Sequence, residues 1–289
     1  MRGRGENRRS DRRVPERPRG RPRVRRGAVL RLRPDRAEMH SNLGDVLSRM
    51  GRDEAAIASF REALRLDPEC VQAHNNLAIL LEKLGKREEA IGHYDAAIRA
   101  RPDYEEAHYN LANLLLRMGD ADGAIAHFRE AVRLDPRYAP AYNNLGNALA
   151  GRGRTAEAVE EYRKALAIDP SLLDAHNNLA NILAGEGKFA EAIEHYRRAL
   201  EINPSYGMAH LNLGYTLEVQ GRRPEALERY RQALRLMPEN VPAHLRLAAA
   251  LAADGKREEA RELIRRALVL EPSSAAAREA LGKIVISNQ

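Results

Sequence analysis

The stretch VQAHNNLAILLEKLGKREEAIGHYDAAIRARPDY, residues 71–104, contains two apolar stripes on either side of a single glycine, Gly85. The apolar residues of each stripe recur at the spacing of one helix face. They are Ala73, Leu77, Leu80, Leu81 and Leu84 in the first stripe, and Ala90, Ile91, Tyr94, Ala97 and Ile98 in the second. Gly85 fits a left-handed helix C-cap, and Pro102 fits the end of a second helix. The stretch therefore predicts a helical hairpin.

This hairpin recurs along the chain with a period of 34 residues. The prolines at the ends of the copies are Pro34, Pro68, Pro102, Pro136, Pro170, Pro204, Pro238 and Pro272. Counting each unit from three residues after a proline, position 7 is always leucine, position 15 glycine, and positions 20 and 27 alanine. The seven full units are 37–70, 71–104, 105–138, 139–172, 173–206, 207–240 and 241–274.

The repeat resembles the tetratricopeptide repeat family, whose 34-residue helix–turn–helix signature reads W-x2-L-G-x2-Y, A-x3-F, P. The fourth unit gives Tyr142, Leu145, Gly146, Leu149, then Ala158, Tyr162, and finally Pro170. Histidine or Tyr142 stands at the family's tryptophan position, and leucine always stands at its first tyrosine position. The resemblance implies an all-α fold, an α-solenoid in which seven hairpins form a right-handed superhelix.

The two ends depart from the full repeat. Residues 27–36 match the end of a second helix whose hairpin is truncated, and residues 275–289 supply one further helix. A lone terminal helix can cover the exposed apolar side of the last hairpin, as a stacked array requires. We therefore expect 275–289 to be a capping helix.

Residues 1–26 form an arginine-rich arm with almost no apolar residues, which we expect to be disordered. Residues 1–36 carry 15 arginines and four acids, so the remaining chain, with 33 basic and 37 acidic residues, is mildly acidic. The arm could bind nucleic acid or acidic partners. The alternatives are a flexible tail, or upstream sequence translated from a wrongly chosen start, in which case Met39 is the alternative start.

The sequence gives no sign of an enzyme. It contains no phosphate-binding loop, nucleophile elbow or metal-ligand cluster, so we expect no catalytic residues, metal or cofactor. Histidines at position 4 are interpreted as packing residues in the tryptophan place, and His93, His127 and His195 at position 23 as a solvated or groove-edge face. One cysteine, no apolar membrane span and no signal peptide favour the cytoplasm.

Asparagine concentrates on one side of the first helices. Of the 16 asparagines, 12 fall at positions 5–9, although asparagine is about 0.6 kcal/mol worse than alanine in a helix. The resemblance implies that the open side of these helices lines a concave groove. The candidate groove residues are Asn42, Asn76, Asn110, Asn113, Asn144, Asn147, Asn178, Asn181, Asn212 and Arg246.

An asparagine amide both donates and accepts, so a ladder of them can hold an extended peptide backbone. This pattern also resembles the repeats of O-GlcNAc transferase. The other interpretations are hydrogen bonds between adjacent helices, or shared ancestry alone. A carboxylate clamp, as in chaperone-binding members of the family, is matched by Asn181, Asn212 and Arg246, but Asn177 and Pro242 occupy its two lysine places.

The leading hypothesis is a non-enzymatic scaffold that binds an extended protein or peptide segment. One alternative is the repeat portion of an O-GlcNAc-transferase-like glycosyltransferase without its catalytic domain, and another is nucleic-acid binding through the arm. The sequence does not indicate the identity of the partner or the oligomeric state.

Overall fold

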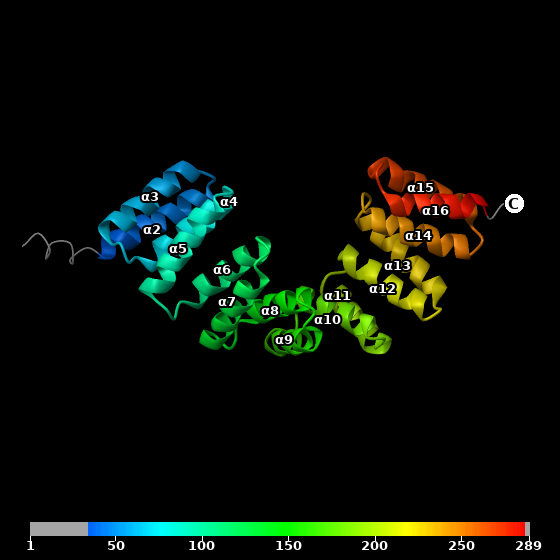
Figure 1. Ribbon diagram of the computed structural model, residues 1–289, viewed down its shortest axis with the longest axis horizontal. Coiled ribbons are helices and arrows are strands. Elements are labelled where there is room, and N and C mark those ends of the chain that lie inside the picture. The colour runs from blue at the N-terminus through cyan, green and yellow to red at the C-terminus, as the bar shows by residue number, and fades with distance from the viewer. Residues whose placement is uncertain (1–33, 287–289) are drawn as a thin grey trace, which may run out of the picture. The chain divides into compact units, whose positions relative to one another are not determined.

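The computed structural model describes residues 34–286, and these residues form fifteen helices and no strand. They divide into two compact units, one ending at Ala73 and the other beginning at His74, which are described separately. Figure 1 shows the helices as successive antiparallel pairs along the chain. The all-α solenoid expected from the sequence is confirmed. The expected arm, residues 1–26, and most of the truncated repeat, 27–36, lie outside the described residues.

The first unit contains one hairpin, α2 (Pro34–Arg49) and α3 (Asp53–Leu66), which pack on each other. Helix α2 begins at Pro34, three residues earlier than the repeat pattern predicts. Proline is well tolerated in the first turn of a helix because its missing N–H has no intrahelical partner there. Asp67, Asp135 and Asp169 each accept a backbone N–H two residues on and so hold a turn, whereas the sequence has at the matching place before Pro34 an arginine, a residue whose side chain has no acceptor.

Helix α4 (Val71–Lys83) begins in the last residues of the first unit, and from there the second unit repeats the hairpin, each first helix being followed by its second helix. The bounds are α5 (Arg87–Ala100), α6 (Glu105–Arg117), α7 (Ala121–Leu134), α8 (Ala139–Gly151), α9 (Thr155–Ile168), α10 (Leu173–Gly185), α11 (Phe189–Ile202), α12 (Gly207–Val219), α13 (Arg223–Leu236), α14 (Val241–Ala253) and α15 (Arg257–Leu270). Helix α16 (Ala275–Ile286) packs on α15 and α14, which is where a capping helix is expected.

A glycine ends the turn between the two helices of every hairpin. Its φ lies between 72° and 89° in all seven copies, as the sequence predicted for Gly85. After α10, the N–H of Lys188 donates to the carbonyl of Leu183, the long bond of a Schellman cap. A left-handed backbone conformation brings Cβ too close to a carbonyl oxygen and costs free energy, so glycine, which has no Cβ, is favoured here.

A close contact between a small residue and a ring holds the two helices of a hairpin together. A Cβ added to Gly146 would lie 2.6 Å from the ring of Tyr162, and one on Gly214 would lie 2.7 Å from the ring of Tyr230. Both rings are almost completely buried. The small residue at position 8 therefore allows the ring at position 24 to lie directly against the first helix.

Contacts between hairpins put the first helices on one side of the second unit. Each second helix packs against the first helix of the next hairpin, and neighbouring first helices also contact one another, from α6 and α8 through α12 and α14. Residues at equivalent positions of successive first helices are therefore neighbours in space. This arrangement brings the asparagine positions into a continuous row.

We expect Gly187→Ala to lower the free energy of unfolding by about 1–2 kcal/mol, because the Cβ of alanine is strained in the left-handed conformation. The matched control is Gly185→Ala, two residues away at the end of α10, where a Cβ meets no atom within 4 Å. That change should leave stability unchanged or raise it by about 0.5–1 kcal/mol. Urea unfolding followed by circular dichroism measures both. Equal effects of the two substitutions would contradict the cap assignment.

Candidate peptide-binding face

The candidate groove residues lie on the first helices with side chains that are half-buried or exposed. Asn42 is exposed in the first unit, and the remaining nine belong to the second unit. Arg246 is exposed on α14, and its guanidinium lies 4.2 Å from the ring centre of Tyr215. The site described below is confined to the second unit.

Asparagines at position 6 hydrogen-bond to asparagines at position 9 of the preceding hairpin. In three successive pairs the Nδ2 group donates to the Oδ1 atom of its partner at nearly the same distance. The bonds are Asn144 to Asn113 (2.8 Å), Asn178 to Asn147 (2.9 Å) and Asn212 to Asn181 (2.9 Å). The inter-helix hydrogen bonds considered from the sequence are therefore present.

A second set of asparagines, at position 5, is buried behind this row. Asn75, Asn143 and Asn177 have exposed fractions of 0%, 6% and 5%. Their Oδ1 atoms accept from position 6 of the next hairpin, and their Nδ2 groups donate to the asparagine that follows each of them. The acceptor bonds are Asn110 to Asn75 (3.1 Å), Asn178 to Asn143 (3.4 Å) and Asn212 to Asn177 (3.4 Å), and the donor bonds end on Asn76, Asn144 and Asn178.

Sequence reasoning did not single out these buried asparagines. The available signal was their spacing of three residues from the buried small residue at position 8, because residues three apart lie on the same face of a helix. A buried amide needs hydrogen-bond partners, so their burial alone would have predicted a network between neighbouring hairpins.

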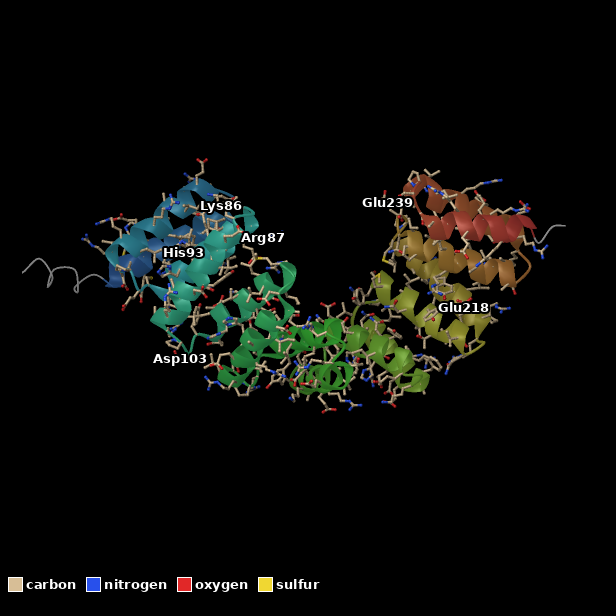
Figure 2. The ribbon with its side chains drawn as sticks, viewed as in Figure 1. Lys86, Arg87, His93, Asp103, Glu218 and Glu239 are labelled. Atoms are coloured by element: carbon tan, nitrogen blue, oxygen red, sulfur yellow. The ribbon has the colours of Figure 1, made fainter. Side chains whose placement is uncertain are left out.

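Tyrosines of the second helices also hydrogen-bond to the asparagines of the first helices. The hydroxyls of Tyr162 and Tyr196 each donate to Oδ1 of an asparagine in their own hairpin, Asn147 and Asn181, at 2.7 Å. Burial raises the pKa of the Tyr162 hydroxyl to about 12, so it remains a donor at neutral pH. In the sixth hairpin the equivalent hydroxyl, that of Tyr230, donates instead to a carboxylate oxygen of Glu218, which Figure 2 labels.

These bonds determine which atoms of the open face remain available. Oδ1 of Asn147 and of Asn181 each accepts two hydrogen bonds, so both amides present Nδ2 outward. Among the described residues neither Nδ2 group has a partner. Asn178 is the reverse case, because its Nδ2 donates twice and its Oδ1 accepts only once. The row therefore presents amide donors at Asn147 and Asn181, whereas Nδ2 of Asn113 donates to the carbonyl of Tyr109, and it presents a carbonyl acceptor at Asn178.

The histidines at position 4 tie successive hairpins together. Nε2–H of His108 and of His176 donates to the carbonyl of the proline six residues earlier, at 3.2 and 3.1 Å. His210 and His244 make the same bond at 3.0 Å. A carbonyl only accepts, so Nε2 carries the proton and Nδ1 of each ring is an acceptor. The recurring histidine and proline thus form one structural contact.

The interpretation of His93, His127 and His195 as a solvated or groove-edge face is wrong. These side chains are half-buried and meet the position-4 histidine of their own hairpin, Nδ1 to Nδ1. The distances are 2.9 Å for His74 and His93 (labelled in Figure 2), 3.0 Å for His108 and His127, and 2.9 Å for His176 and His195. The 19-residue separation brings each pair together across the hairpin.

The described residues contain no cluster of three or more histidine, cysteine, aspartate or glutamate side chains placed to hold a metal ion. None of the helices in 34–286 is both long and apolar enough to span a bilayer.

Because the row of amides joins neighbouring hairpins, we expect Asn178→Ala to lower the free energy of unfolding by about 1–2 kcal/mol. The change removes two donated bonds and leaves buried Asn143 without its donor, which outweighs the gain of about 0.6 kcal/mol in helix propensity. The control is Asn42→Ala, a change of an exposed side chain on α2, which should be neutral or stabilising. Urea midpoints give the comparison, and a stable Asn178→Ala protein would refute the structural contribution of the row.

Stability should fall as pH decreases from 7.5 to 5. Burial lowers the pKa of His127, His176, His195 and His210 below the ordinary value of 6.5. Below that value the unfolded chain therefore binds protons that the folded chain does not, and folding is disfavoured. Above it this contribution to stability is fully present.

Urea midpoints at the two pH values measure the loss. In a variant carrying His127→Asn and His195→Asn, the amide supplies a donor near the place of Nδ1 without titrating, so the loss should be smaller. Equal losses in the variant and the parent protein would show that the pairs do not cause the pH dependence.

The stacked hairpins and the ordered row of amides define a helical-repeat protein of the kind that binds other proteins. Tetratricopeptide repeat models match almost the whole described chain. One matches residues 27–68, 41–105 and 109–172, and three others match 173–206, 207–232 and 220–284. The chain belongs to the tetratricopeptide repeat family. No curated protein matches it in sequence.

Solved structures with the same fold include other tetratricopeptide proteins. A chain of the APC/C hetero-tetramer Cut9–Hcn1 is 18% identical with a TM-score of 0.70; the match covers 89% of this chain but 51% of that one. PilF of Pseudomonas aeruginosa is 22% identical with a TM-score of 0.67, covering 75% and 98%. YrrB, described as a TPR protein with an unusual peptide-binding site, is 26% identical with a TM-score of 0.53, covering 65% and 96%. This chain thus spans about half the length of the Cut9–Hcn1 chain.

Proposed function

We propose that the protein is a non-enzymatic scaffold whose open face binds an extended peptide of a partner protein through the backbone of that peptide. The observation that carries the proposal is the outward Nδ2 group of Asn147 and Asn181, each with no partner among the described residues. An amide fixed in this orientation donates to a ligand carbonyl without first breaking a bond to the protein.

The alternation of donors and acceptors along the face suits a peptide backbone. Asn147 and Asn181 at position 9 offer Nδ2 donors, and one turn away the Oδ1 atoms of Asn144 and Asn178 each accept only one bond from the protein. An extended peptide presents carbonyl and N–H groups in alternation, so both kinds can be paired. The fixed network also lowers the entropy lost on binding, since the amides are already oriented.

The likeness to YrrB supports peptide binding, because that protein is described as having a peptide-binding site. The single cysteine, buried near the end of the first unit, is compatible with a reducing compartment, and we propose the cytoplasm as the location.

Replacing Asn147 and Asn181 together with aspartate tests the role of their donors. A carboxylate keeps the oxygen that accepts from the tyrosine and from the next asparagine, but it removes the outward N–H groups and repels a carbonyl. We expect peptide affinity to fall at least tenfold while the urea midpoint changes little, since roughly 0.5–1.5 kcal/mol is lost for each bond. The probes are peptides selected from a 12-residue random library by the full-length parent protein, with binding measured calorimetrically.

A site that binds the peptide backbone also predicts how changes in those peptides affect their affinity. Side-chain changes should weaken binding mildly, whereas methylation of single backbone nitrogens near the centre should weaken it strongly. Unchanged affinity of the double aspartate variant, or tolerance of backbone methylation throughout, would refute recognition by these amides.

A further inference from the structure

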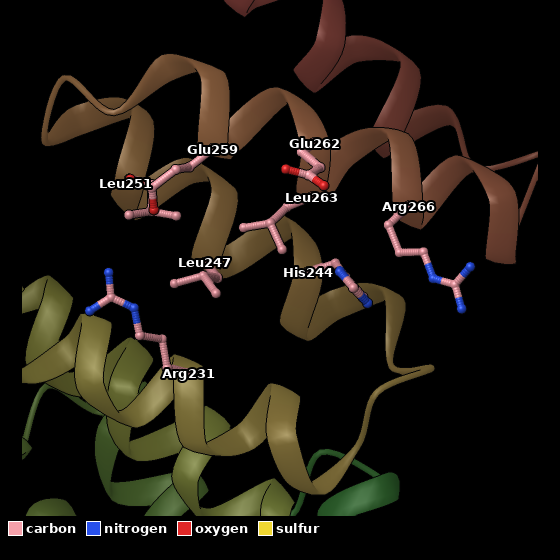
Figure 3. A pocket seen from close by; sticks show the side chains of 8 residues that line it. All are labelled: Arg231, His244, Leu247, Leu251, Glu259, Glu262, Leu263 and Arg266. Carbon is pink, nitrogen blue, oxygen red and sulfur yellow. The ribbon is translucent and has the colours of Figure 1, made fainter.

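A pocket of about 380 Å³ opens between α13, α14 and α15, at the last full hairpin. Its apolar wall consists of Leu247, Leu251 and Leu263, and two arginines and two glutamates surround the rim. Figure 3 shows Arg231 entering from α13 while the other side chains come from α14 and α15. The α14 residues that line the pocket stand at positions 4, 7 and 11 of their repeat, and not at positions 6 and 9, so the pocket is separate from the row of amides.

The pocket contains a buried acceptor atom without a donor. His244, which lines it, is 5% exposed, and its Nε2–H donates to the carbonyl of Pro238 at 3.0 Å. Nδ1 must therefore be the unprotonated nitrogen. It is fully buried and has no hydrogen-bond partner among the described residues. An unsatisfied buried acceptor is unfavourable, so a donor that reaches it from the pocket gains a hydrogen bond.

Three other hairpins show what kind of group satisfies this nitrogen, whereas Nδ1 of His210 in the sixth hairpin is also buried and without a partner among the described residues. In the second, third and fifth hairpins the ring of a histidine at position 23 lies 2.9–3.0 Å away from it, and the two ring centres are 5.1–5.2 Å apart. In the seventh hairpin position 23 is Leu263, which has no donor and lines the pocket instead. Leu263 and the pocket that it lines therefore stand where three sister repeats have a donor-bearing ring.

We propose that this pocket binds a planar ring with an N–H donor on its edge, such as an imidazole or indole, supplied by a ligand. The N–H donates to Nδ1 of His244, and the ring faces pack on the leucine side chains. Two arginines and two glutamates balance at the rim, which favours a neutral ring over an ion. The volume lies within the range of about 300–1,000 Å³ usual for small-ligand sites and accommodates a fused bicyclic ring.

Indole and 1-methylindole, added to the full-length protein, form the matched pair of probes. They have the same apolar body, but only indole carries the N–H. Nuclear magnetic resonance of leucine methyl groups and of the His244 imidazole nitrogens reports binding at the site. We expect indole to shift both sets of signals and to bind at least fivefold more tightly than 1-methylindole, as one buried hydrogen bond provides. Equal binding of the two, or no shift at His244, overturns the proposal.

The variant Leu263→His places the ring of the sister hairpins into the pocket from within. We expect it to reduce indole affinity at least tenfold and to give Nδ1 of His244 the nitrogen shift of a hydrogen-bonded acceptor. If that variant loses helical content, Leu263→Phe fills the same space without a donor and should block indole equally. Indole binding unaffected by a folded variant overturns the assignment to this pocket.

The ring can come from a polypeptide side chain or from a free small molecule. N-acetyl-tryptophanamide and N-acetyl-histidinamide represent the first source, and free indole and imidazole the second. Binding of the amides at least as tight as that of the free rings assigns the site to a partner's side chain. Exclusion of the amides assigns it to a small molecule, and failure of all four probes overturns the proposal.

Discussion

The close contact between a small residue on the first helix and a ring on the second is the constraint on which the other interactions depend. Gly146 lets the ring of Tyr162 lie against α8, and this position brings the hydroxyl within 2.7 Å of Asn147. The hydroxyl then orients the asparagine amide, which in turn accepts from Asn178 of the next hairpin. Core packing and surface chemistry are thus consecutive steps of one chain of contacts, and a change in the first step alters the last.

Much of the fold followed from the 34-residue period, because helix caps and apolar spacing are local properties. The glycine C-caps and the helical pairs needed only neighbouring residues for their prediction. The partners of polar side chains could not be predicted in the same way. His176 and His195 are 19 residues apart and meet only because of the rotation of two helices about their axes, which the apolar pattern defines too coarsely. For the same reason the buried position of Asn143 and Asn177 was missed.

The asparagines show why a sequence pattern alone left two interpretations open. An unfavourable residue at position 6 of six of the seven first helices indicates a compensating interaction, but the pattern does not say whether the partner is a ligand or another helix. The structure assigns the contacts between helices to particular atoms of each asparagine rather than to the whole side chain. In Asn178 the donors serve the neighbouring hairpin, while in Asn181 the oxygen does so and the nitrogen faces outward. One network can therefore contribute both to cohesion and, as proposed, to recognition.

The asparagine–asparagine hydrogen bonds between hairpins join residues 31 positions apart, three fewer than the period. Removing one whole period, residues 139–172, would therefore bring Asn178 into the place of Asn144, opposite Asn113. Asn147 and its partner Tyr162 would be removed together with their hairpin, so no asparagine of the row would lose only one of its partners. The number of hairpins can consequently change by recombination between repeats without redesign of the junctions. For such a chain, the length of the row of amides is a quantity that evolution can adjust in whole steps.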